Sequence, residues 1–284
     1  MRAFAASVQE VFREAAARWT LIAYFALSSL FILIFALAVN LDVVNGALAG
    51  AKLFGQSVDF GGRAVEIDKI VLGFESGFSG FLYLVGTFLA LFATAHLVPR
   101  LQEKGTIDLY LSRPVGRIPL LLSRFAGGVL LAAANIAYLI GSMWLIVVWK
   151  THVLHPRFLL SGAVILFTFA TLLAFAFLIG VVTSSTGVSI MATYAIFFFG
   201  AILAAHERFE AAVSTELAAR IISGLYWALP KTAELGKATV ALVAGAEAPE
   251  QLAAINHFAV FGSTAVFGVL ALSLASWLFS RKDF

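Results

Sequence analysis

The sequence predicts an all-α, polytopic membrane protein with six transmembrane helices, an N-terminal interfacial helix and short extracytoplasmic helices before the last span. Three observations support this: the composition, six long apolar runs, and an uneven distribution of Lys and Arg. Of the 284 residues, 61% are hydrophobic and 12% are charged, whereas soluble domains average about 45–50% and about 25%. Such a chain cannot cover a water-facing surface, which excludes a soluble fold. The 27 Phe and 5 Trp residues exclude intrinsic disorder.

Six apolar runs are long enough to cross a bilayer, whose hydrocarbon core requires about 20 residues of helix. They cover residues 20–41, 77–98, 120–148, 158–182, 187–205 and 258–279. Arg124 is the one charged residue inside them, and it lies one turn from the start of the third run, where its side chain can reach the interface. We therefore expect residues 1–284 to form a single transmembrane domain.

The Lys and Arg residues between the runs indicate the orientation. With the N-terminus inside, the inner segments carry a net charge of +5 and the longer outer segments a net charge of −2. Both termini are therefore predicted to be cytoplasmic. Cleavage after Ala36-Leu37-Ala38 as a signal peptide is the alternative for the first run, but that run is longer than a usual signal-peptide core.

The first 19 residues have the pattern of an amphipathic helix. Phe4, Phe12 and Trp19 share one face with Val8, Val11 and Ala15, while basic and acidic residues occupy the rest. An apolar face with aromatic residues and basic flanks is typical of a helix that lies in the cytoplasmic interface plane. A plain helical extension of the first span is the alternative.

Two outer segments are long enough to fold by themselves. In residues 42–76, two alternating runs, Val58–Phe60 and Ala64–Ile67, surround Gly61-Gly62 and predict a small β-hairpin. In residues 206–257, helical patterning covers Phe209–Ile222 and Ala233–Val243. Both pieces are too short to cross, so we expect short helices at the outer leaflet.

The inner segment 99–119 is the most charged part of the chain and much longer than a turn requires. Thr106 can cap a short helix over Thr106–Leu111, and Arg113-Pro114 ends it, because proline disfavours helix at the preceding residue. Such a helix, projecting from two long membrane helices, suits contact with a cytoplasmic partner. A merely solvated, positively charged loop is the equally weighted alternative.

The string Glu103–Arg117, followed by Leu121-Leu122-Ser123-Arg124, resembles the inner-loop signature of ABC-2 type transporter permeases. The most similar branch is that of permeases associated with multicopper-enzyme and nitrous oxide reductase maturation. The ending Trp277–Phe284 is also similar to that of the family. The sequence differs from the usual pattern at Lys104, where an acidic residue or Gly is common, and at Arg124, where Lys is common.

The resemblance implies a permease subunit of a bacterial inner membrane that pairs with a second permease, with a homodimer expected. Two copies of a separate ATPase subunit would bind ATP and Mg²⁺, and an extracytoplasmic partner is allowed. The inner loop would be the coupling helix that docks on the ATPase, through Glu103, Gly105, Thr106, Asp108, Arg113, Pro114 and Arg117. Phe4, Phe12 and Trp19 would anchor the interfacial helix. The cargo cannot be read from the sequence.

The chain itself offers no catalytic, cofactor or metal site. The string Gly236-Lys237-Ala238 lacks the earlier glycine and the hydroxyl of a phosphate-binding loop. His152 and His155 have ligand-like spacing, but the sequence has no Cys and only 3 Met, so soft copper ligands are scarce. We expect two interfacial histidines and no nucleic-acid partner.

Other functional classes fit less well. An ion- or proton-coupled carrier without an ATPase usually places charged residues at mid-membrane, whereas the mid-span polar residues here are of the Asn135 and Thr168 type. Glu75 and Glu207 are the only acids placed to gate an outer exit, and solvated helix ends are the alternative. A structural membrane subunit without an ATPase partner also stays open.

Overall fold

The structure is a computed structural model that describes residues 19–44, 47–53, 56–58, 67–102, 116–213, 215–249, 252 and 256–282. The predicted interfacial residues Phe4 and Phe12 lie outside these ranges. Trp19 is the first residue of the first described helix, α2, where the backbone alone is described.

Long helices form most of the molecule: α2 (Trp19–Ala38), α3 (Ile67–Thr94), α6 (Arg117–Thr151), α7 (Arg157–Thr183), α8 (Thr186–Leu203) and α13 (His257–Arg281). In the described part of the chain, five helices are long and apolar enough to cross a membrane: α3 with its extension α4, α6, α7, α8 and α13. The apolar stretch of α2, Ile22–Leu37, is shorter. The chain is therefore a polytopic membrane protein, and the count of six spans stays a prediction.

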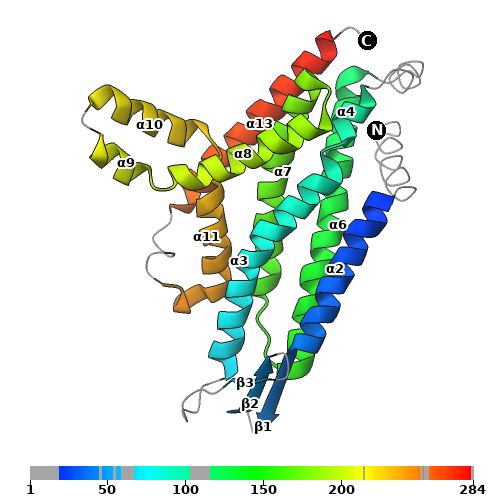
Figure 1. Cartoon of the computed structure of the whole chain (residues 1–284), viewed down its shortest axis with the longest axis vertical. Coiled ribbons are helices and arrows are strands. Elements are labelled where there is room, and N and C mark those ends of the chain that lie inside the picture. Colours follow the sequence, from blue (N-terminus) through cyan, green and yellow to red (C-terminus); the bar gives the residue numbers. More distant parts are fainter. Residues whose placement is uncertain are drawn as a thin grey trace.

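Helix α7 lies at the centre of the bundle and packs against α3, α6, α8 and α13 (Figure 1). Its Phe158, Phe169 and Phe177 are almost completely buried. Helix α2 lies on the outside and runs parallel to α6, since Ser28 contacts Asn135 while Ala36 contacts Lys150 farther along α6. The start of α2 therefore lies at the same end of the bundle as the start of α6.

Proline explains the break between α3 and the short helix α4 (Leu97–Leu101). Pro99 has no N–H to donate to the carbonyl of Ala95, and its ring would clash with that carbonyl in a continuous helix. The chain accordingly turns at Ala95 and His96 before α4 begins. The kink directs α4 against α6, α7 and α8.

A small antiparallel sheet corrects two predictions. Its strands are β1 (Val39–Val44), β2 (Ala47–Leu53) and β3 (Gln56–Val58), in the order β1-β2-β3. Apart from this sheet, the described residues are all-α, and the run 20–41 leaves its helix at Ala38. Most of the hairpin predicted around Gly61-Gly62 lies outside the described residues; Val58 of its first run pairs with Ala51, and Ile67 of its second run begins α3. Asn45-Gly46, between β1 and β2, is the stronger hairpin signal.

Between α8 and α13 the chain forms α9 (His206–Ala212), α10 (Glu216–Ala228), α11 (Thr232–Ala244) and the short 3-10 helix η1 (Gly245–Glu247). The prediction of one helix over Phe209–Ile222 was wrong, because the backbone at Val213 and Thr215 is extended and separates α9 from α10. The α9–α10 pair projects from the bundle, whereas α11 returns to pack on α3 and α7 (Figure 1).

Candidate functional site

The predicted docking segment is bordered by two described residues, Gln102 after α4 and Gly116 before α6. Of the predicted docking residues, Glu103, Gly105, Thr106, Asp108, Arg113 and Pro114 lie outside the described residues, whereas Arg117 begins α6. The site is therefore built from the two ends of the segment and from what holds them.

Gln102, at the first end, bonds to the C-terminus of α7. Its Nε2 donates to the carbonyl of Gly180 (2.8 Å), and its Oε1 accepts from Ser184 Oγ (3.1 Å). Ser184 follows the last residue of α7 in a left-handed conformation, with φ of 53°, so its hydroxyl turns back toward α4. These bonds fasten the end of α4 to the turn between α7 and α8.

Lys282, directly after α13, joins the same group. Its Nζ donates to Gln102 Oε1 (2.6 Å), to the carbonyl of Val181 (2.8 Å) and to Ser184 Oγ (2.8 Å). The cation thereby satisfies an unpaired carbonyl in the last turn of α7, where the helix dipole favours positive charge. Burial lowers the pKa of the Lys282 amine, and the three acceptors compensate for part of the lost hydration.

Arg117, at the other end of the segment, binds the end of α13. Its Nη1 donates to the carbonyls of Ser280 (3.1 Å) and Lys282 (2.8 Å). We call Gln102, Arg117, Ser184 and Lys282 the loop-base cluster. Through it, both ends of the predicted docking segment are fixed to α7 and α13, so a displacement of the segment would be passed directly to these two helices.

Only part of the loop-base cluster could be found in the sequence. The resemblance indicates Arg117, but Gln102, Ser184 and Lys282 give no signal of their own. The one available hint is position, because polar residues that border a predicted docking loop or end a span are placed to cap helix termini. That hint does not specify which residues meet.

A second polar cluster, which sequence reasoning missed, surrounds the turn Leu229–Thr232 between α10 and α11. The Lys231 N–H donates to Thr264 Oγ1 of α13 (3.2 Å), and Thr232 Oγ1 donates to the carbonyl of Phe197 in α8 (2.8 Å). The Tyr83 hydroxyl of α3 donates to the carbonyl of Thr232 (2.5 Å). This turn, the Lys231 turn, therefore connects α3, α8, α11 and α13.

Lys231 itself is buried within this turn. Its side chain is 2% exposed, and its Nζ donates to the carbonyl of Tyr226 (3.1 Å). The ammonium also lies 4.0 Å from the ring centre of Tyr226 and 4.5 Å from that of Trp227, within cation–π range. Burial lowers the Lys231 pKa, and the Glu234 charge opposes this shift in part.

The outer acids and histidines differ from one another. Glu75 is 1% exposed, and its Oε2 lies 2.9 Å from Nδ1 of His155, so it is no solvated helix end. Glu207 is exposed, and His152 is an exposed residue in left-handed conformation that ends α6. Among the described residues, no three His, Asp or Glu side chains group as metal ligands.

In a comparison with known protein families, residues 11–284 match the family model described as ABC-2 family transporter protein. The match includes all the described helices and the loop-base cluster. No curated protein matches the chain.

Proposed function

The chain belongs to the ABC-2 family of transporter membrane proteins, and from that membership we propose that it couples ATP hydrolysis by separate ATPase subunits to export or to force transmission. As an ABC transporter permease it is a membrane transport component. Glu103–Arg117 would be the segment that docks on the ATPase. The inner-loop string supports a place in the branch associated with multicopper-enzyme and nitrous oxide reductase maturation.

The observation that carries the proposal is the loop-base cluster. A docking segment can transmit force only if its two ends are fixed to the helices that must move. Gln102 and Arg117 fulfil this condition, because one is bonded to α7 and Lys282 and the other to the end of α13. The movement we propose is rigid-body rocking of the packed helices between two states.

The proposed assembly contains two permeases, which we expect to form a homodimer, and two ATPase subunits that bind ATP and Mg²⁺. The starts of α2 and α6 and the end of α13 lie at one end of the bundle, which supports termini on the same side as the docking segment. The excess of Lys and Arg on these segments supports a cytoplasmic location in a bacterial inner membrane.

Co-purification of the tagged chain from its native membrane in mild detergent, with mass spectrometry, tests the proposal. We expect an ATPase subunit in equal stoichiometry, and its loss in Glu103→Arg and Arg113→Glu. Arg208→Glu, on the exposed helix α9, is the matched control with a reversed charge, and we expect this variant to co-purify with the ATPase. Recovery of the folded wild-type chain without any ATPase would contradict the proposal.

A further inference from the structure

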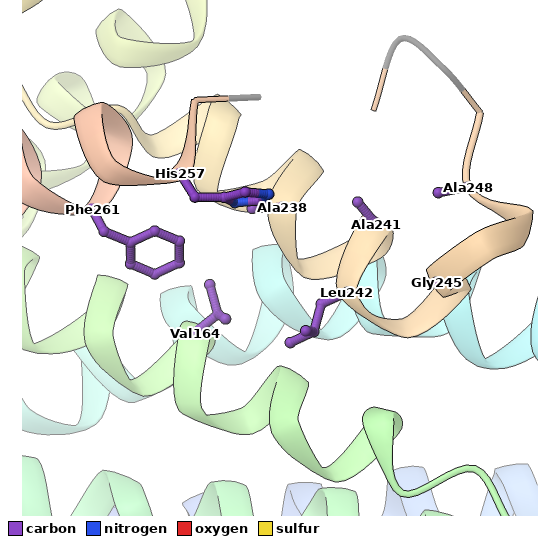
Figure 2. A pocket seen from close by; sticks show the side chains of 8 residues that line it. All are labelled: Val164, Ala238, Ala241, Leu242, Gly245, Ala248, His257 and Phe261. Atoms are coloured by element: carbon purple, nitrogen blue, oxygen red, sulfur yellow. The ribbon is translucent and has the colours of Figure 1, made fainter. Parts of the chain in front are cut away.

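A cavity of about 260 Å³ lies between α7, α11 and α13, away from the loop-base cluster (Figure 2). Apart from His257, every lining residue is apolar or glycine: Val164, Ala238, Ala241, Leu242, Gly245, Ala248 and Phe261. An apolar cavity of about 150 Å³ stays dry and accepts benzene. This larger one has room for an apolar ligand and no set of polar partners that would hold water.

The two walls of the cavity that are formed by the long helices α7 and α13 continue into exposed apolar surface. One turn before Val164 on α7, Leu160 is 54% exposed, and one turn before Phe261 on α13, Phe258 is 96% exposed. The lining is therefore continuous with side chains that face outward at the starts of α7 and α13. Because both helices are long and apolar enough to cross a membrane, side chains on this outward face would meet lipid.

Two polar side chains border the cavity at different ends. Arg157 is the first residue of α7 and His257 the first of α13. The Arg157 guanidinium occupies the space where a Cβ on Gly245 would lie, and Gly245 has φ of +58°, so a side chain there would displace it. The His257 ring extends from α13 toward Ala238 of α11 (Figure 2). Glu247, on η1, is the acidic residue nearest to Gly245 in the sequence.

We propose that this cavity binds one hydrocarbon chain of a bilayer phospholipid, whose phosphate is held by Arg157. A chain fits because the walls are apolar from Phe258 and Leu160 inward to Val164 and Leu242. A phosphate fits because Arg157, an exposed cation at the start of a span, stands at the level where headgroups begin. The proposal does not depend on the ATPase-coupled function.

The test uses the purified full chain in nanodiscs that contain a phosphatidylglycerol with a photoactivatable diazirine on one acyl chain. Mass spectrometry locates the crosslinks. We expect them to concentrate on Val164, Ala241, Leu242 and Phe261. Ala241→Phe, which fills the cavity, is expected to reduce them about tenfold, equivalent to about 1.4 kcal/mol. Ala201→Phe, on the exposed side of α8, is the matched control and leaves them unchanged.

Val164→Phe fills the cavity from the opposite wall, so the test does not depend on one variant folding. Arg157→Gln is expected to weaken the crosslinks of the anionic probe. Equal labelling of the cavity in wild type and in both filled variants would overturn the proposal. So would wild-type labelling that is no stronger on the lining residues than on exposed span residues such as Leu145 and Val269.

Discussion

Single charged residues in this protein are held by partners from distant parts of the chain. Lys282 bonds to Gln102, 180 positions away, and to Ser184, 98 positions away. Glu75 meets His155 across 80 positions. A buried charge is costly unless it is paired or hydrogen-bonded. Replacing one residue of such a pair should therefore destabilise the protein, because the other residue is left without its partner.

The buried Lys231 gives the stability of the protein a predictable dependence on pH. Because burial lowers its pKa from the ordinary 10.5, the unfolded state keeps this proton over a range in which the folded state has released it. The free energy of unfolding therefore rises with pH through that range, up to about 10.5. We expect the wild type to gain stability relative to Lys231→Met as the pH is raised from neutral.

Unfolding in detergent, followed by circular dichroism at several pH values, measures this difference. Lys237→Met, which removes an exposed lysine of α11, the helix that follows Lys231, controls for the change in net charge. A difference between wild type and Lys231→Met that stays constant or falls with pH would be inconsistent with the burial of Lys231.

The Glu75–His155 pair predicts a non-additive result. In His155→Leu the buried carboxylate loses its partner for Oε2 while Oε1 already has none among the described residues, and we expect a loss of about 1–3 kcal/mol. Replacing both residues by Leu removes the unpaired group and should restore much of that stability. Thermal unfolding of the two single variants and the double variant tests this, and a double variant less stable than both single variants would refute it.

At the scale of elements, the apolar runs predicted the long helices, because the length and hydrophobicity of a run decide whether that segment can be buried in lipid. Each of the six runs overlaps a described helix, with ends shifted by up to ten residues at the start of α3. The ends depend on local signals that the runs do not show. β1 begins inside the first run, and the extended backbone at Val213 and Thr215 separates α9 from α10.

The sites were less predictable than the helices. The docking segment could be indicated by resemblance because its signature is continuous in the sequence. The loop-base cluster and the Lys231 turn are each assembled from four elements, and the bonds run mainly to backbone carbonyls such as those of Gly180, Tyr226 and Phe197. Backbone acceptors leave no trace in residue identity, so the buried Lys231 looked like an ordinary loop lysine.

The contact between α8 and the Lys231 turn requires glycine at position 200. A Cβ there would lie 2.6 Å from Thr232 Oγ1 and 2.7 Å from the carbonyl oxygen of Pro230. Gly200→Ala should therefore destabilise the protein by about 1–3 kcal/mol. Gly141→Ala, where nothing lies within 4 Å, should instead gain about 0.5–1 kcal/mol from helix propensity. Thermal unfolding of both variants measures these stability changes, and equal effects of the two substitutions would disprove the close contact at Gly200.

For the whole molecule, the structure and the charge distribution predict that the loop-base cluster is cytoplasmic and η1 is not. The absence of cysteine from the sequence makes single-cysteine labelling direct. A membrane-impermeant maleimide applied to intact cells should label Glu247→Cys but not Thr183→Cys, at the end of α7. After permeabilisation both should react. Labelling of Thr183→Cys in intact cells would reverse the proposed orientation.

In the proposed mechanism, ATP-driven movement enters through the docking segment and reaches the spans through the loop-base cluster. The most direct measurement is the distance between spin labels on Glu247→Cys in the two permeases of the assembled complex, with and without ATP and vanadate. We predict a shift with ATP in the otherwise wild-type protein. With Lys282→Met added, the shift should be lost while the ATPase stays bound and active. An unchanged shift with Lys282→Met, or none in the wild type, would contradict the claim.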